Sequence, residues 1–495
     1  MQKVLELPGN PVEFSLKKSP SFSSLIRAEE VLGDRWTSQA LDLDIRHGHG
    51  SLLSLLAAVG VVGPYKTLSP WEYRDPTGHR TINAAGYSAL PFGDNYPPLI
   101  DFVSRFLKSH SGIGLPQQST TPWRAALEAN LIRLLSSFAP SHADSRVFFS
   151  NSGTESIEGA LKFAQSARPK ARHIINFTRA YHGKTLLSLS VTPNPTIRKG
   201  FEHLLTKSVT LPYGDLSRFE DAVKKLGAEH IVCVILEPIQ GEAGCILPPA
   251  GFLREIGRIC QEKGIIVIAD EIQTGLGRTG HWFESLAQGL EPDIICLAKP
   301  LGGGLIPVGA TLVRDWIFKK MLGKIGDVKR HSNTFGGNSL AMAIGLKALE
   351  ILIDEDLPNR SNIMGVIGLE RLRKLQAQHP KLIREVRGAG MLMAIGFEPI
   401  MGSKILASNI HLINEVTGLF ALKTFYEGGV QLNFSLNSAS TLRLTPAMNM
   451  PDALFDEMFR SLFSTAGQLT SSTEMFSKTP LSVLLKLLRT MVKTG

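Results

Sequence analysis

The chain has 495 residues, of which 43% are hydrophobic and 20% charged, so it can bury large cores and is not a disordered segment. Its net charge is +9, but Lys and Arg are dispersed, which favours a solvated surface or an anionic substrate over nucleic-acid binding. Four scattered cysteines without a CxxC pair exclude a disulfide framework and predict buried thiols in a reducing compartment.

The N-terminal residues give no sign of a signal peptide or a membrane span. The first 50 residues have no apolar stretch after a basic start, and the most apolar run, at 52–63, is too short to span a bilayer. That run predicts a buried helix or strand. We therefore expect a soluble, cytoplasmic protein.

From residue 146 onward, short apolar strands alternate with amphipathic helices. Strands are expected at 146–150, 173–177, 231–237, 265–270, 293–298 and 308–313, and helices at 154–167, 251–264 and 339–357. This alternation predicts an α/β fold with a mostly parallel sheet flanked by helices. Beyond 358 we expect a smaller α+β domain, and at 469–495 a basic amphipathic tail. The tail packs on this protein or a partner subunit, or it lies on a membrane surface, and the first is favoured.

The stretch IIVIADEIQTGLGRTG, at 265–280, raises the question of a dinucleotide site, because GLGRTG matches G-x-G-x-x-G. In a dinucleotide fold this turn joins a strand directly to a helix. Here four residues separate Asp270 from Gly275, and the following HWFESLAQGLEPD fits that unit poorly. We interpret the glycines as a tight loop and place an NAD-dependent dehydrogenase last among the candidate functions.

Two residues at strand ends suggest a different chemistry. Asp270 closes one expected strand and Lys299 follows the next, and parallel-sheet enzymes place their chemistry at the carboxyl ends of strands. Pyridoxal phosphate (PLP) would partner both, with an aldehyde for the lysine and a ring nitrogen for the aspartate. The alternative is that Asp270 caps a turn and Lys299 lies on the surface.

The segment SNSGTESIEGALK, at 150–162, reads as a strand end, a turn of small residues and a helix. Ser152, Gly153 and Thr154 would present backbone N–H groups and hydroxyls to a phosphate at the helix N-terminus. The alternative is a simple helix cap. In AYHGKT, at 180–185, an aromatic side chain follows a strand and could cover a ring.

Taken together, these segments resemble those of a class III, fold type I aminotransferase of the acetylornithine/ornithine type. Seven motifs carry the resemblance in family order: NSGTESIEGALK, YHGKT, EPIQGEAG, IADEIQTGLGRTG, DIICLAKPLGGGLIPVGA, NTFGGNSLA and LRLTP. They span about 150–450. The resemblance implies a large PLP-binding domain at 101–357 and a small domain at 358–468. Residues 1–100 would contribute to the small domain and the active-site entrance.

The resemblance also implies roles for individual residues. Lys299 would be the Schiff-base lysine that moves the substrate proton, Asp270 would pair with the pyridine nitrogen, and Thr334 would reach the phosphate of a neighbouring subunit in a homodimer. The implied cofactor-binding residues are Ser152, Gly153, Thr154, Tyr181, His182, Asp270, Gln273, Lys299 and Thr334. No metal site is expected.

The expected substrate contacts are Tyr87, Lys184, Glu242 and Arg443. Arg443 matches the arginine that clamps a substrate carboxylate, and Glu242 the glutamate that neutralises it when an amine donor is bound. Lys184 stands where ornithine aminotransferases carry an arginine, and Asp94 replaces a usual histidine. These departures lie where donor specificity is set.

The sequence therefore predicts a PLP-dependent aminotransferase that works by two half-reactions. The donor would be an ω-amine or a basic amino acid such as ornithine or acetylornithine, and the acceptor an oxo acid, with 2-oxoglutarate favoured. The same Lys299 and Asp270 would also serve an amino-acid racemase or lyase. A third reading is a catalytically silent PLP-fold subunit. We expect no nucleic-acid partner.

Overall fold

A computed structural model describes residues 25–33, 36–110, 112, 119–400, 410–484 and 487. Expectations that fall on residues 1–24, and on 485–495 apart from 487, lie outside the described residues. Within the described ranges, no helix is long and apolar enough to cross a membrane.

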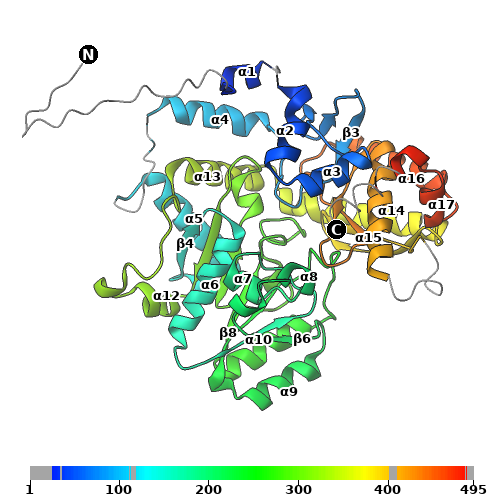
Figure 1. The fold of residues 1–495 in the computed structure, drawn as a ribbon. Helices are drawn as coiled ribbons and strands as arrows, with labels where there is room; N and C mark the ends of the chain where they lie inside the picture. The colour runs from blue at the N-terminus through cyan, green and yellow to red at the C-terminus, as the bar shows by residue number, and fades with distance from the viewer. Residues whose placement is uncertain are drawn as a thin grey trace, which may run out of the picture.

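The largest sheet has seven strands in the described chain (Figure 1). In order across the sheet they are β4 (Arg146–Ser150), β10 (Gly309–Val313), β9 (Ile294–Leu297), β8 (Ile266–Asp270), β7 (Ile231–Leu236), β5 (His173–Phe177) and β6 (Val209–Leu211). Neighbours from β9 to β6 are parallel, whereas β10 is antiparallel to both of its neighbours. The mostly parallel sheet is confirmed, and each predicted strand is correct to within one residue at either end.

Alternate residues of the strands pack against helices on the two opposite faces of the sheet. In β7, Cys233 and Ile235 face a cluster with α6 (Gly153–Ala167), while Val234 and Leu236 face α9 (Leu216–Leu226) and α10 (Phe252–Lys263). The second face continues under α5 (Pro122–Phe138) and α13 (Ser339–Asp354). Because both faces are covered, the central strands are apolar throughout, as the sequence pattern requires.

The C-terminal part contains a smaller antiparallel sheet. Its order is β11 (Ile383–Ala389), β12 (Leu392–Phe397), β15 (Thr441–Leu444) and β14 (Asn433–Phe434). One apolar cluster packs this sheet against α14 (Leu357–Gln378), α15 (Ile410–Glu427) and α16 (Asp452–Gly467).

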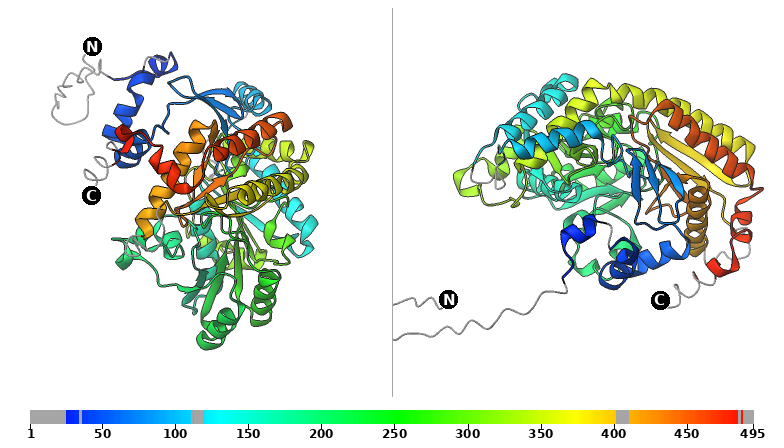
Figure 2. Two further views of the ribbon diagram at one scale, coloured as in Figure 1. Left: turned by 90° about the vertical axis from the view of Figure 1, so that its right-hand side faces the viewer. Right: turned by 90° about the horizontal axis from the view of Figure 1, so that it is seen from above.

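The N-terminal segment joins this same C-terminal part. A third sheet has the order β1 (Lys66–Ser69), β2 (Glu72–Arg74), β3 (Arg80–Asn83) and β13 (Val430–Gln431), with β3 parallel to β13. After α2 (Ala40–His47) and α3 (Gly50–Ala58), Val59 and Val61 are buried in the C-terminal cluster. Figure 2 shows these blue helices beside the orange and red ones. The residue bounds of the domains stay a proposal.

One expectation needs adjustment. The predicted helix 339–357 is wrong at its end: α13 stops at Asp354, Asp356 has a left-handed φ of 46°, and α14 begins at Leu357 with Pro358 in its first turn. Proline lacks the N–H needed to continue a preceding helix, so the chain turns there. In the described part of the tail, α17 (Ser472–Ser477) is short, and Met475 and Leu487 are buried in the C-terminal cluster.

The remaining helices are short or peripheral. They are α1 (Ala28–Leu32), α4 (Pro97–Lys108), α7 (Leu186–Ser190), α8 (Pro195–Arg198), α11 (Glu284–Ala287) and α12 (Asp315–Leu322).

Candidate active site

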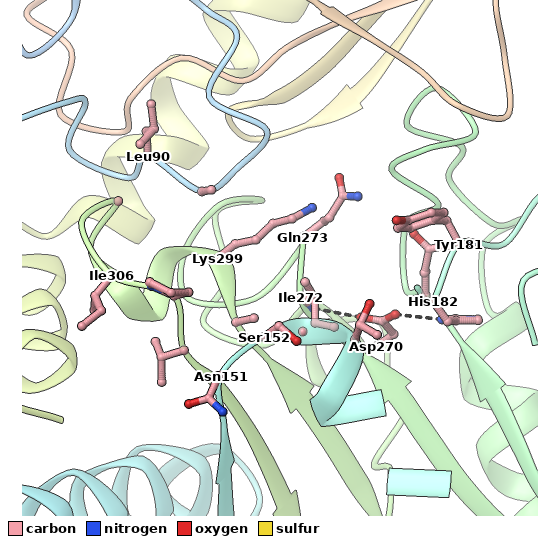
Figure 3. Close-up of a pocket in the computed structure, with 18 of the residues that line it drawn as sticks. Leu90, Asn151, Ser152, Tyr181, His182, Asp270, Ile272, Gln273, Lys299 and Ile306 are labelled. Atoms are coloured by element: carbon pink, nitrogen blue, oxygen red, sulfur yellow. Dashed lines mark hydrogen bonds and ion pairs between the residues drawn. The ribbon is translucent and has the colours of Figure 1, made fainter. Parts of the chain in front are cut away.

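The carboxyl ends of three neighbouring parallel strands meet at one cavity of about 480 Å³. Glu237 follows β7, Asp270 ends β8 and Lys299 lies two residues after β9, and all three line the cavity. Figure 3 shows Asp270 and Lys299 among the lining side chains. Other lining residues are Ala89, Leu90, Asn151, Ser152, Gly153, Thr154, Tyr181, His182, Ile272, Gln273 and the segment 304–308. The sheet thus brings together residues that are far apart in sequence, as expected at the carboxyl edge of a parallel sheet.

Asp270 is a buried carboxylate with two hydrogen-bond partners. Its Oδ2 lies 2.7 Å from Nδ1 of His182, and its Oδ1 accepts a hydrogen bond from the Ile272 N–H at 3.1 Å. Nε2 of the buried His182 has no hydrogen-bond partner among the described residues. A buried carboxylate held in this way can face a protonated ring nitrogen across the cavity.

Lys299 is held in a strained backbone conformation two residues after β9. Its φ of 36° lies in the left-handed region, which costs free energy for a residue other than glycine. Burial lowers the pKa of Lys299 to about 8, although the nearby Glu242 acts in the opposite direction. The neutral form of the amine is therefore far more populated near neutral pH than in an ordinary lysine, as a nucleophile or base requires.

The N-terminus of α6 forms another wall. The Ser152 hydroxyl caps the helix by accepting a hydrogen bond from the Glu155 N–H at 3.2 Å, and Gly153 and Thr154 line the cavity beside it. The positive end of the helix dipole and its first N–H groups favour an anion at this position.

A buried ion pair is connected to the cavity through the side chain of Gln273. Arg443 lies 2.8 Å from Glu242, and their side chains are 0% and 5% exposed. Gln273, which lines the cavity, bridges them: its Nε2 donates to Glu242 at 3.0 Å and its Oε1 accepts from Arg443 at 2.9 Å. Burial alone would raise the pKa of Glu242, but the charges of Arg443 and Lys299 outweigh it and hold that pKa below its ordinary value.

Two tyrosines lie near these charges. The ring of Tyr87 is centred 5.5 Å from the guanidinium carbon of Arg443 and is 47% exposed, so it stands at the outer side of the ion pair. Tyr181 lines the cavity, and burial followed by the charge of Glu242 raises its pKa to about 12, so its hydroxyl stays protonated.

Five of the predicted site residues are not among the residues that line the cavity: Tyr87, Glu242 and Arg443, which are described above, and Lys184 and Thr334. Lys184 is exposed on the loop before α7 and is not among the lining residues. Thr334 is also exposed, but its neighbour Asn333 accepts a hydrogen bond at 3.1 Å from the side chain of Asn151, which lines the cavity. The roles expected for both residues stay predictions.

The sequence interpretation missed Glu237. This residue accepts backbone hydrogen bonds from Tyr181 at 2.9 Å and Gly241 at 3.1 Å, and burial together with the charge of Asp270 holds its pKa well above the ordinary range. The signal was present, because Glu237 follows an apolar strand just as Lys299 does. Ile272, two residues after Asp270, was missed because a lone aliphatic residue carries no chemical signal.

The residues present fit pyridoxal phosphate. The cavity contains an amine with a lowered pKa, a buried carboxylate, an aromatic side chain and a helix N-terminus suited to a phosphate. At the Asp270 end of the cavity, Nε2 of His182 has no hydrogen-bond partner among the described residues and is available to a further polar group.

Solved structures share the fold of this chain. A transaminase from the marine bacterium Virgibacillus matches with a TM-score of 0.77 and 24% identity, covering 88% of this chain and all of the other. Ornithine aminotransferase from Toxoplasma gondii ME49 matches with a TM-score of 0.75 and 23% identity over 90% and 99% of the two chains. An amine transaminase from an uncultivated Pseudomonas species, solved in its PLP-bound form, gives 0.73 and 24% over 82% and 95%.

Residues 71–465 match the family model of class-III aminotransferases, and that span contains every residue placed at the cavity above. The chain therefore belongs to the class-III aminotransferases and is a PLP-dependent transaminase of fold type I.

Proposed function

We propose that this enzyme moves an amino group from an ω-amine or a basic amino acid, of the ornithine or acetylornithine kind, to 2-oxoglutarate. The observation that carries this proposal is the buried pair of Arg443 and Glu242, joined through Gln273 to the cavity that contains Lys299. A transaminase must accept two different substrates in one site, and this pair offers a site with two charge states.

In the closed pair, Glu242 neutralises Arg443, so the site presents no net charge there and suits a donor whose reacting end has no carboxylate. When an oxo acid enters, its carboxylate replaces Glu242 on the guanidinium fork. Gln273 contacts both partners and can follow either arrangement. The substrate that is bound therefore determines whether the ion pair is open or closed.

Bound PLP supplies an electron sink that stabilises negative charge at the substrate carbon. Lys299 would hold the cofactor and take up or return the substrate proton at its amine, for which its lowered pKa suits it. Asp270, supported by His182, holds the proton of the ring nitrogen. Tyr181 would cover the ring, and Ser152, Gly153 and Thr154 would bind the phosphate.

The enzyme would work as a cytoplasmic homodimer. Thr334 is exposed in the single chain but lies on the loop that bonds to Asn151, so a second subunit could meet it close to the cavity. The four cysteines are free and buried, as suits a reducing compartment.

Nitrogen transfer tests the proposed function. The enzyme is incubated with 2-oxoglutarate and δ-¹⁵N-labelled ornithine, or with a labelled ω-amine, and the glutamate formed is analysed by mass spectrometry. We expect labelled glutamate at a rate that falls to background in Lys299→Ala. Inversion of the donor without labelled glutamate would instead favour racemase chemistry.

A further inference from the structure

The glycine-rich turn at 275–280 has no role in the function described so far, yet it is a contact point between the large sheet and the C-terminal part. Gly277 and Gly280 have φ values of 91° and 98°. A Cβ at Gly277 would lie 2.9 Å from Pro358, and one at Gly280 would lie 2.9 Å from Asn362. The turn therefore packs directly on the start of α14 and tolerates no side chain at these two positions.

Arg278, in the middle of this turn, extends into the C-terminal part. Its side chain is 0% exposed, and its Nη1 donates to the carbonyls of Pro446 at 2.5 Å and Met391 at 3.3 Å. The Met391 N–H in turn donates to the Arg278 carbonyl at 2.9 Å. Nε and Nη2 of Arg278 have no partner among the described residues, and burial lowers its pKa to about 9.

The segment that Arg278 contacts carries the substrate end of the site. Pro446 lies three residues after Arg443, just beyond the end of β15. On either side of Pro446, the Thr445 N–H donates to Ala84 and the Met448 N–H donates to Pro91, each at 2.8 Å. Residues 84–91, which include Tyr87 and the cavity-lining Leu90, are thus hydrogen-bonded at both ends to the segment that contains Pro446.

We propose that Arg278 is a positioning residue that holds Arg443 and the 84–91 segment in place over the cofactor cavity. It joins the turn that follows Asp270 to the carbonyl groups of Pro446 and Met391, so one contact supports both Arg443 and the segment that carries Tyr87. This inference rests on the proposed function, because it assigns Arg443 to the oxo-acid carboxylate.

The arrangement of Arg278 is unfavourable for stability. A buried cation without a carboxylate partner and with unpaired N–H groups destabilises the folded state, and an apolar side chain of similar length would remove that cost. Its presence at the junction therefore points to positioning rather than to stabilisation.

The test compares the holoenzyme with Arg278→Met and Arg278→Lys, and uses the exposed Arg258→Met on α10 as the matched control. Each half-reaction is measured separately, together with the thermal unfolding midpoint. We expect Arg278→Met to raise the KM for 2-oxoglutarate about tenfold, with less than a twofold change for a simple ω-amine and no fall in the midpoint. Arg278→Lys should recover part of the loss.

A double-mutant cycle separates this inference from the proposed function. In an Arg443→Met background, Arg278→Met should add less than twofold to the KM for 2-oxoglutarate, because the group that it positions is gone. If Arg443→Met itself has no effect on 2-oxoglutarate, the proposed function fails. If Arg443→Met acts but Arg278→Met affects both halves equally, or acts additively, the inference is overturned. Should Arg278→Met not fold, the same cycle with Arg278→Lys decides by the same criteria.

Discussion

The carboxylate of Asp270 and the imidazole of His182 lie 2.7 Å apart, both buried, at the floor of the cofactor cavity. The contact fixes the direction of the carboxylate, and the second carboxylate oxygen is fixed by the Ile272 N–H. His182 is itself held by its backbone N–H, which donates to the Thr192 hydroxyl at 2.9 Å. The position of Asp270 is therefore set by contacts within the fold.

This arrangement predicts unequal effects of two substitutions. Asp270→Asn removes the charge that we propose holds the ring-nitrogen proton, so kcat should fall roughly 100-fold or more. His182→Gln keeps a donor toward Asp270, and kcat should fall only about tenfold. Steady-state kinetics with PLP in excess gives both values, and a larger loss in His182→Gln would contradict the assigned roles.

The lowered pKa of Lys299 predicts the pH dependence of cofactor capture. Only the neutral amine attacks an aldehyde, so the rate at which cofactor-free protein captures PLP should rise about tenfold per pH unit below pH 8 and level off above it. The change in visible absorbance reports the rate. The control is Nα-acetyllysine, whose rate should continue to rise toward pH 10.5, the ordinary lysine value. A protein profile that matches this control would disprove the lowered pKa.

Glu271 predicts a pH dependence of stability. Burial raises its pKa to about 7, although the Ser285 N–H, at 2.6 Å, and the Thr274 hydroxyl both donate to it. In the unfolded chain Glu271 has the ordinary pKa of 4.5, so below pH 4.5 it is protonated in both the folded and the unfolded protein. Between 4.5 and 7 only the unfolded state loses its proton, so the unfolding free energy falls with rising pH by about 3 kcal/mol in total.

Glu271→Gln removes this loss because its side chain stays neutral. The thermal unfolding midpoint of Glu271→Gln, relative to that of the wild type, should increase from pH 5 to pH 8. For the exposed Glu262→Gln, the difference from the wild type should stay constant over the same range. Parallel curves for Glu271→Gln and the wild type would show that Glu271 titrates normally.

A shared active site predicts complementation between inactive subunits. Lys299→Ala removes the lysine, and Thr334→Asp would place a negative charge against the phosphate of the neighbouring subunit in the proposed homodimer. If each site takes these two residues from different chains, mixed dimers restore one intact site. Random mixing should then recover about a quarter of wild-type activity. No recovery, with mixed dimers demonstrated by differently tagged subunits, would place Thr334 outside the neighbouring site.

The sequence was sufficient to predict those site residues whose position depends only on the end of a single strand. Asp270 and Lys299 follow from the rule that parallel sheets collect polar residues at their carboxyl edge, and Glu237 obeys the same rule. The direction of β10 could not be predicted, because an apolar run reads the same in either orientation. The helix break at Asp356 depends on a left-handed residue that nothing in the apolar pattern required.

Other features depend on contacts between distant segments. The pairing of Arg443 with Glu242 was expected only from the family resemblance, since no local pattern links two residues in different parts of the fold. Arg278 follows a glycine in a turn, where an arginine is usually solvated. Its complete burial arises from the docking of β15 and the β11–β12 turn, which is a tertiary effect.

The most direct test of the account measures the two half-reactions separately in Arg443→Met and Glu242→Gln. Arg443→Met should raise the KM for 2-oxoglutarate roughly 30-fold and leave the amine half within about threefold, because only the oxo acid needs the free guanidinium. Glu242→Gln should show the reverse pattern, since an uncompensated Arg443 disfavours an amine donor. Equal losses in both halves for either variant would contradict the exchange of partners at Arg443.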